Sequence, residues 1–194
     1  MSNIKNIMLV TQSATPFDEL KSSLSDTGVE NIHSLSFKQD ILAHITKIQP
    51  DAVIIEIESL DHELLNQIKS INQSYAIPVL LFTETDEDQI IEKAIKSGVA
   101  TYIVGPLDAH RLGSILQVAI TRFKEVQQIK SDLLKTRAQL EDRKVIDKAK
   151  GILMKHKQFT EDEAYQALRK MAMDKNKRII DIAEGIIATF DLLE

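Results

Sequence analysis

Cationic side chains gather in the last third of the chain, where they could hold the phosphates of a nucleic acid. Between Arg143 and Arg178 there are 11 basic and 5 acidic residues, with Tyr165 among them. Lys and Arg bind phosphates and aromatic rings stack on unpaired bases, a combination typical of RNA recognition. The residues that we expect to contact RNA are Lys148, Ala149, Lys150, Gly151, Lys155, Tyr165, Arg169, Lys170, Lys175, Lys177 and Arg178.

The charge of the chain is divided unevenly along its length. Residues 1–110 hold 7 Lys and Arg and 16 Asp and Glu, whereas residues 111–194 hold 17 and 13. This division favours an acidic regulatory half and a half that binds a polyanion, although a solvated helical face explains the counts equally well. Ala149 and Gly151 would let a backbone approach either RNA or a neighbouring helix closely. Tyr165 could stack on a base or pack in a core.

The composition argues against other kinds of chemistry. The chain has no Cys, so disulfides, thiolate metal sites and Cys nucleophiles are excluded. Its five His are scattered without ligand spacing, and we find neither a nucleophile–base pair nor a Gly-rich phosphate loop. We therefore expect no enzyme, metal or cofactor. The apolar runs are too short for a signal peptide or a membrane span, which predicts a cytoplasmic protein without membrane contact.

Three short helices are predicted at the C-terminal end, over residues 143–157, 159–178 and 179–193. Thr160 can cap the second helix, and Glu163 completes a capping box three residues later. Apolar residues at helical spacing predict a small three-helix bundle, with Met154 and Phe190 in its core and the basic side chains outside. The segment lacks a helix-turn-helix pattern, so reading of the DNA major groove is not favoured.

A single long helix is predicted before this bundle, over residues 107–142. Its apolar residues recur every seven positions, which is typical of a coiled coil. Lys130 and Arg137 occupy companion positions and disfavour larger bundles. We therefore favour a parallel homodimer, with an intrachain helical hairpin against the last domain as the alternative. The expected dimer seam consists of Leu112, Leu116, Ala119, Phe123, Val126, Leu133 and Leu140.

The first half alternates short β-branched segments with stretches of helical length, including Phe17–Ser25 and Asp86–Ser97. This alternation predicts a flavodoxin-like α/β fold, a five-stranded doubly wound parallel sheet, ahead of the all-α part. Functional groups of such sheets lie at the carboxyl ends of the strands. We therefore expect domains at residues 1–110, 107–142 (the coiled-coil linker) and 140–194. The expected strands are Ile7–Val10, Ile32–Leu35, Ala52–Ile57, Val79–Phe82 and Thr101–Val104.

Residues 50–56, 78–83 and 97–106 resemble the third strand, the fourth strand and the turn into the fifth strand of bacterial receiver domains. The resemblance covers about residues 4–122. It implies a Mg²⁺ site formed by an acidic pair, an acceptor Asp, a hydroxyl and a Lys. Here Thr11 and Gln12 replace the acidic pair, Glu56 replaces the acceptor, Gly105 replaces the Lys, and Thr83 is retained.

Glu56 and Thr83 therefore mark a phospho-acceptor position that we expect to be inactive. One Glu among neutral groups supplies too few oxygen ligands for Mg²⁺, and its extra methylene displaces the carboxylate from in-line attack. Glu58 and Asp61 are poor substitutes because both follow the strand end. The segment is thus predicted to be a pseudo-receiver, in which Glu56 could imitate a permanent negative charge.

Residues 149–154, 163–165, 168–169, 172–173 and 182–183 resemble the ANTAR domain, over about Leu140–Leu193. The resemblance implies an RNA-binding module that holds paired hairpins in leader transcripts and prevents formation of a terminator. The order of the three parts, and the stretch 94–104, are similar to antiterminators of nitrate assimilation. That similarity implies control by a ligand-sensing partner protein instead of a kinase.

The sequence thus predicts a transcription antiterminator of the response-regulator class that binds leader hairpins as a homodimer. Nitrate and nitrite assimilation is the process that the resemblance suggests. A phosphorylation-dependent two-component response regulator is the alternative. A structural adaptor acting through its coiled coil is a third hypothesis, and it predicts no affinity for RNA.

Overall fold

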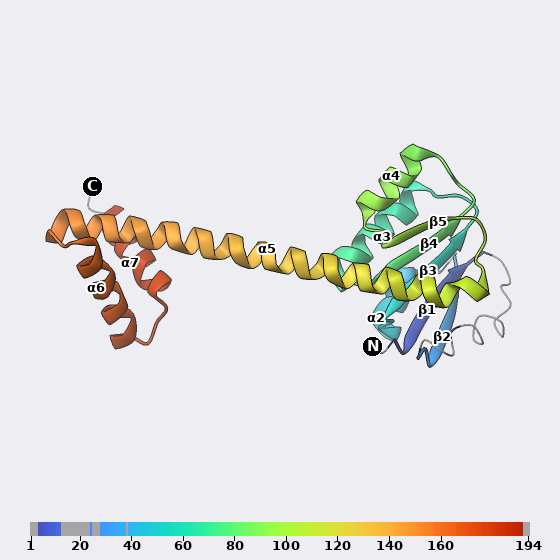
Figure 1. Cartoon of the computed structure of the whole chain (residues 1–194), viewed down its shortest axis with the longest axis horizontal. Coiled ribbons are helices and arrows are strands. Elements are labelled where there is room, and N and C mark those ends of the chain that lie inside the picture. Colours follow the sequence, from blue (N-terminus) through green and yellow to red (C-terminus); the bar gives the residue numbers. More distant parts are fainter. Residues whose placement is uncertain (1–3, 13–23, 25–27, 38, 192–194) are drawn as a thin grey trace. The chain divides into compact units, whose positions relative to one another are not determined.

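The computed structural model describes residues 4–12, 24, 28–37 and 39–191, which form two compact units (Figure 1). Unit 1 extends to Gln128, and unit 2 begins at Ile129. Over the described ranges, no helix combines the length and the apolar character needed to cross a membrane.

Five parallel strands form the sheet of unit 1 in the order β2-β1-β3-β4-β5, which confirms the predicted doubly wound α/β fold. The three central strands β1, β3 and β4 are almost wholly buried, because apolar side chains cover both faces of the sheet. Each predicted strand is present. The strands are β1 Asn6–Thr11, β2 Asn31–Ser36, β3 Ala52–Ile57, β4 Val79–Thr83 and β5 Thr101–Val104.

Helices cover the two faces of this sheet and create two apolar cores. Helices α2 (Ile41–Ile48), α3 (His62–Tyr75) and α4 (Asp88–Ser97) pack on one face, and the first part of α5 packs on the other (Figure 1). The helix expected over Asp86–Ser97 is α4. The helix expected over Phe17–Ser25 lies outside the described residues, apart from the buried Leu24.

Helix α5 is one continuous helix from Ala109 to Lys157. The sequence predicted that one helix ends near residue 142 and that another begins at residue 143. No break occurs there, because the segment contains no Pro and its only glycines are Gly113 and Gly151, which are tolerated within a helix.

Part of the expected dimer seam belongs instead to the interior of unit 1. Leu112, Leu116, Ala119 and Phe123 are at most 9% exposed, so they are unavailable to a second chain. A seven-residue repeat could not reveal this difference, since packing on a sheet and packing on a helix both require one apolar stripe. The remaining seam residues are exposed. They are Val126, Leu133 and Leu140.

Unit 2 is the predicted three-helix bundle. Helices α6 (Glu161–Asp174) and α7 (Ile179–Asp191) pack with the C-terminal part of α5 around a core that includes Leu153, Leu168 and Ile182. Met154 was expected in this core but is 40% exposed. Phe190 is half-buried, and its ring lies 4.6 Å from the His156 ring between centroids.

The predicted capping box begins α6. The Glu163 amide donates to the Thr160 hydroxyl at 3.3 Å, and the Thr160 amide donates to the Glu163 carboxylate at 2.8 Å. The Thr160 amide, and then the Thr160 hydroxyl, which also donates to the Glu163 carboxylate at 3.0 Å, hold the pKa of Glu163 below its ordinary value of 4.5. A lowered carboxyl pKa stabilises the folded state above the unfolded pKa, and the contribution is lost as the pH falls through the folded pKa.

Replacing Thr160 by Ala is expected to weaken the first turn of α6 by about 1 kcal/mol, the usual contribution of an N-cap. Hydrogen exchange at the Glu163 amide should then accelerate about fivefold at neutral pH. The difference in exchange rate between the variant and the wild-type chain should shrink as the pH falls below the ordinary Glu pKa. Thr189→Ala is the matched control, because that hydroxyl donates only to the Gly185 carbonyl within α7. Equal exchange in the Thr160 variant and the wild-type chain would contradict the capping role.

Candidate nucleic-acid interface

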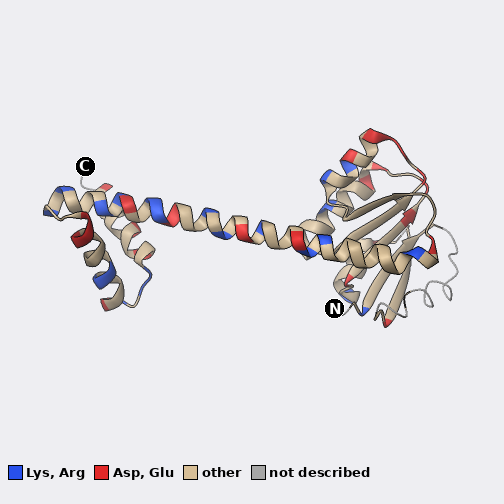
Figure 2. Ribbon diagram, in the orientation of Figure 1, with Lys and Arg blue, Asp and Glu red and all other residues tan. Residues whose placement is uncertain are grey.

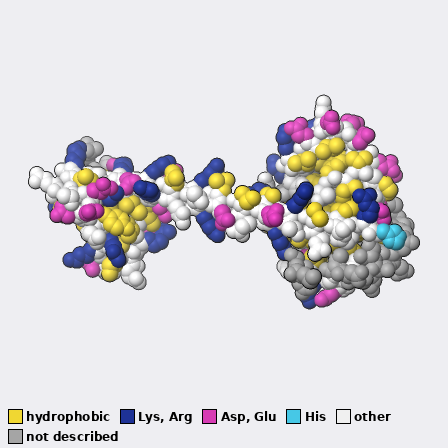
Figure 3. Space-filling model, in the orientation of Figure 1, with side chains coloured by type: hydrophobic (Ala, Val, Ile, Leu, Met, Phe, Trp, Pro, Cys, Tyr) yellow, Lys and Arg dark blue, Asp and Glu magenta, His cyan; other side chains and the backbone are white. Residues whose placement is uncertain are grey.

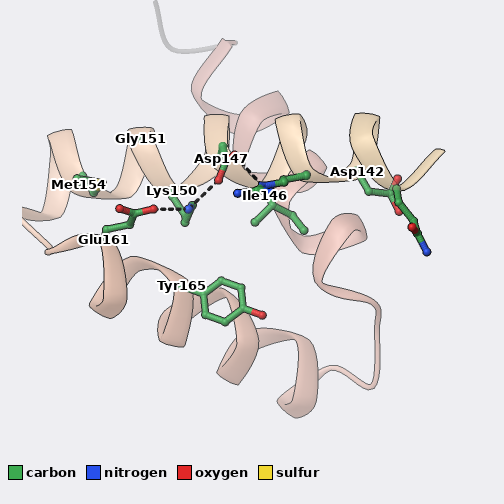
Figure 4. Close-up of a pocket in the computed structure, with 10 residues that line it drawn as sticks. Asp142, Ile146, Asp147, Lys150, Gly151, Met154, Glu161 and Tyr165 are labelled. Carbon is green, nitrogen blue, oxygen red and sulfur yellow. Dashed lines mark hydrogen bonds and ion pairs between the residues drawn. The ribbon is translucent and has the colours of Figure 1, made fainter. Parts of the chain in front are cut away.

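A groove of about 530 Å³ lies within unit 2, between α5 and the first turns of α6 (Figure 4). Ile146, Met154 and the ring of Tyr165 supply its apolar surface, and charged groups surround them. Figure 3 shows an apolar area on unit 2 with Lys and Arg at its edge. The groove therefore offers apolar contact beside cations, which suits a nucleic-acid base and its phosphate. Its other lining residues are Gln139, Asp142, Arg143, Asp147, Lys150, Gly151 and Glu161.

Lys150 ties α5 to α6 across this groove. Its ammonium group lies 2.7 Å from a carboxylate oxygen of Asp147 and 2.7 Å from one of Glu161, and its side chain is only 14% exposed (Figure 4). The hydrogen bonds to Asp147 and then to Glu161 raise the pKa of Lys150, and the same ammonium lowers the pKa of Asp147. The Lys150 ammonium, expected to bind a phosphate, is thus already neutralised by two carboxylates. This arrangement fits a residue that holds α5 and α6 together better than one that is free to bind RNA.

The two small residues beside Lys150 have different environments. Ala149 is fully buried in the core of unit 2, so the expectation that it contacts RNA is corrected: its small size serves helix packing. Gly151 is exposed at the groove, and a Cβ added there would meet no atom within 4 Å. Packing within the chain therefore does not require a glycine at position 151, and the open surface leaves room for a ligand.

Helix α6 presents a row of exposed side chains suited to stacking. Tyr165, Arg169 and Met173 follow one another at intervals of four residues, which places them on one helix face. Tyr165 is 41% and Met173 is 72% exposed. We call these three residues the α6 face. Met173 was not among the residues predicted to contact RNA, although its spacing of four residues from Arg169 and eight from Tyr165 indicates the same helix face.

The basic residues from Lys148 to Arg178 fall into two groups. The ammonium nitrogen of Lys148 lies 3.5 Å from a carboxylate oxygen of Asp191, and a guanidinium nitrogen of Arg178 lies 2.7 Å from one of Asp181. Both cations therefore have acidic partners, as Lys150 does. The second group has no acidic partner within 4.0 Å among the residues that the structure describes. Binding of phosphate by this group breaks no ion pair within the described chain. Its members lie at the end of α5, on α6 and in the α6–α7 connection (Figure 2). They are Lys155, Lys157, Arg169, Lys170, Lys175 and Lys177.

A smaller cavity of about 200 Å³ lies at the carboxyl ends of the strands in unit 1, where the phospho-acceptor position was expected. The Glu56 carboxylate accepts hydrogen bonds from the Thr11 hydroxyl at 3.0 Å and from the Leu107 amide at 3.2 Å. Thr83 is buried and donates to the Glu58 carbonyl at 3.0 Å. Glu56 thus ties β3 to β1 and to the segment between β5 and α5. The contact with Leu107 uses a backbone amide and gave no signal in the sequence.

Metal binding finds no further support in these side chains. Across the described part of the chain, no three His, Asp or Glu residues converge so that they could hold a metal ion.

The hydroxyl of Tyr102, on β5, donates to the Thr85 carbonyl at 2.8 Å. Burial, assisted by the charges of Asp86 and Glu87, raises the pKa of Tyr102, so this donor remains protonated at neutral pH.

Comparison with known proteins identifies the C-terminal segment. Residues 134–187 match the ANTAR domain family. The transcriptional regulatory protein PdtaR of Mycobacterium tuberculosis is 22% identical over 185 residues, covering 95% of this chain and 90% of that protein. The nitrate regulatory protein of Klebsiella oxytoca is 48% identical over 73 residues, which are 38% of this chain and 18% of that protein.

The fold of unit 1 also has a known counterpart. The chemotaxis response regulator CheY4 of Vibrio cholerae matches with a TM-score of 0.50 and 19% identity, covering 60% of this chain and 98% of that structure. Unit 1 therefore has the receiver fold, and an ANTAR domain occupies most of unit 2.

Proposed function

We propose that this chain, a non-enzymatic transcriptional regulator of the response-regulator type with a C-terminal ANTAR domain, binds hairpins in leader transcripts and thereby prevents transcription termination. The observation that carries the proposal is the α6 face, where Tyr165, Arg169 and Met173 are exposed beside cations that have no acidic partner among the described residues. Bases stack on aromatic rings and on Arg planes, while Lys and Arg hold the phosphates.

The groove beside Tyr165 is the proposed site for an unpaired base of a hairpin loop. Ile146, Met154 and the Tyr165 ring supply apolar contact, and Gly151 leaves the α5 side open. Asp147 and Glu161 lie at the same groove but are neutralised in part by Lys150. The Lys150 bridge thus lowers the repulsion that two free carboxylates would exert on a phosphate backbone.

RNA binding is tested by isolating the full chain with its ligands from cell lysate and sequencing the recovered nucleic acid. We expect leader transcripts with paired hairpins, and tighter binding of such hairpins than of random duplex DNA. Equal affinity for both would contradict RNA specificity. A complete lack of RNA binding would favour the hypothesis of a structural adaptor.

Unit 1 is proposed to act as a pseudo-receiver that responds to a ligand-sensing protein instead of phosphorylation. Two observations support this proposal: the Glu56 carboxylate is engaged by Thr11 and Leu107, and neutral Thr11 and Gln12 stand where the acidic pair is expected. The excess of acidic residues over positions 1–110 would suit a partner with a basic surface.

Incubation of the full chain with Mg²⁺ and acetyl phosphate is expected to give no stable label. A Glu56→Asp variant should also stay unlabelled, because shortening the side chain restores neither the acidic pair nor the Lys that phosphoryl transfer requires. A receiver with an intact acidic pocket serves as the positive control. Stable labelling of the wild-type chain would establish the alternative, a phosphorylation-dependent response regulator.

Control of nitrate and nitrite assimilation is proposed as the biological role. Its support is the resemblance to the nitrate-assimilation antiterminator NasT, together with the identity shared with the Klebsiella oxytoca nitrate regulatory protein. The chain is further proposed to act as a homodimer, because two weak hairpin contacts that are tethered together gain from effective concentration.

A further inference from the structure

A second groove lies within unit 1, between the N-terminal ends of α2 and α3, and it shares no residue with the Glu56 cavity. Its volume is about 700 Å³. Phe37, Leu42 and Leu64 supply its apolar surface, and the first two are only partly buried against the core beneath. We call it the α2–α3 groove. Its other lining residues are Gln39, Asp40, Asp61, Glu63 and Gln67.

The two helices are joined at the opposite end from this groove. The hydroxyls of Thr46, in the last turn of α2, and Tyr75, the last residue of α3, lie 2.9 Å apart and share a hydrogen bond. Within the described chain, no hydrogen bond or ion pair joins the first turns of α2 and α3. An apolar side chain from another molecule can therefore enter between the first turns without breaking a bond that holds the helices together.

Capping residues place carboxylates at the open end of both helices. Asp40 caps α2 and accepts a hydrogen bond from the Ala43 amide at 3.1 Å, and Asp61 caps α3 and accepts one from the Leu64 amide at 2.8 Å. Each cap uses one carboxylate oxygen. In the described part of the chain, the other oxygen of each accepts no hydrogen bond. Capping thus leaves one oxygen of each carboxylate available to a cationic ligand.

Every ionisable side chain that lines the α2–α3 groove is a carboxylate. Asp40, Asp61 and Glu63 have no basic nitrogen within 4.0 Å among the described residues. The lysines of the same helices come later, with Lys47 in the last turn of α2 and Lys69 in the middle of α3. Negative charge beside an apolar surface repels the phosphates of RNA and complements a cation that has an apolar neighbour.

We propose that the α2–α3 groove is the surface on which unit 1 binds a basic amphipathic helix of a partner protein. A helix docks in a groove between two others when its apolar side chains interdigitate with theirs. A large apolar residue of the partner helix then lies against Phe37 and Leu42. Lys or Arg one turn away on that helix reaches Asp61 and Glu63, and Arg can bind both oxygens of one carboxylate.

The inference rests on the proposed function only in giving unit 1 a protein partner. It adds the place where this partner binds and the charge of the partner segment. Binding of RNA by the α6 face does not enter into it, so the two can fail separately.

Two synthetic peptides of about 14 residues, long enough to form a helix, serve as probes in the absence of RNA. Both carry Leu at helical spacing; one has Lys at the flanking positions, and the other has Glu in place of each Lys. We expect the basic peptide to bind the full chain at least about tenfold more tightly than the acidic peptide. In the nitrogen-15 spectrum of the chain, the basic peptide should shift the amide signals of Gln39, Leu42 and Gln67.

Two variants separate charge from apolar contact. Glu63→Lys with Gln67→Lys reverses charge at the groove and leaves both caps in place, so the dissociation constant of the basic peptide should rise about tenfold. Leu42→Gln keeps the charge and removes the apolar contact, and it should weaken binding by a similar factor. The matched control, Asp88→Lys with Gln89→Lys, makes the same charge change in the first turn of α4. It should bind like the wild-type chain.

Thermal unfolding of each variant shows whether the fold of unit 1 is kept. Equal binding of the two peptides, or shifts confined to residues outside the groove, would overturn the proposal. Unchanged binding by a folded Leu42→Gln chain would also overturn it, because charge attraction alone would then explain the affinity. A chain that binds neither peptide, yet binds hairpin RNA and takes no label from acetyl phosphate, would refute the α2–α3 groove as a docking surface and leave the proposed function intact.

Discussion

Replacing Tyr165 by Ala is expected to weaken binding of a leader hairpin between about fivefold and 150-fold. Stacking of a base on an aromatic side chain contributes about 1–3 kcal/mol by Ala substitution, and a free energy of about 1.4 kcal/mol corresponds to a tenfold change in affinity. Titration of labelled hairpin RNA with the full chain measures the change. Tyr165 is 41% exposed, so its loss should leave the folded core of unit 2 intact.

Tyr165→Phe is the matched control, because it keeps the ring and removes only the hydroxyl. We expect nearly wild-type affinity for this variant. If Phe and Ala weaken binding equally, the hydroxyl and not the ring contacts RNA. If neither substitution changes the affinity, the α6 face is not the RNA-binding surface.

The second large effect concerns the salt dependence of RNA binding. Combined replacement of Arg169 and Lys170 by Gln is expected to reduce the slope of log affinity against log salt by roughly 1.4–1.8, since each lost phosphate contact removes about 0.7–0.9. Neither residue has an acidic partner in the described chain. Over the range 50–200 mM salt, such a change alters the affinity about tenfold. Affinity measured at several salt concentrations gives the slope.

Lys150→Gln provides the informative contrast. The sequence predicts that Lys150 contributes to the salt slope as Arg169 and Lys170 do, but its ammonium is already bound by Asp147 and Glu161. We expect this variant to bind RNA more weakly, because it loosens α6 and frees two carboxylates, and yet to keep nearly the wild-type slope. Lys47→Gln makes the same charge change on α2 of unit 1 and should alter neither quantity. A slope that falls by about one in the Lys150 variant would show direct phosphate contact.

Local sequence signals determined most of the secondary structure. β-branched runs predicted all five strands of the sheet, because buried parallel strands need apolar side chains on both faces. The capping box of Thr160 and Glu163 was equally readable, because its hydrogen bonds join residues three positions apart. These features depend on contacts between near neighbours, so their spacing in the chain is sufficient to predict them.

The sequence also indicated where a ligand would bind, but it did not determine which side chains are available there. Ala149, Lys150 and Gly151 are consecutive, yet one is buried, one is bridged to α6 and one is open to the groove. Helical rotation separates neighbouring residues by about 100°, so the packing of α6 and α7 against α5 assigns each a different environment.

Residue types and spacing were enough to predict the strands, the helix cap, the seven-residue apolar repeat and the division of charge. They could not predict that Leu112 and Leu116 are buried on the sheet while Leu133 and Leu140 are exposed on α5, because this depends on how the chain folds. Only the tertiary structure placed the Leu107 amide on Glu56, 51 positions earlier in the chain. The physical reason is the same in both cases. The spacing of residues indicates whether a side chain needs apolar or polar surroundings. Folding brings distant segments together and so determines which residues surround it.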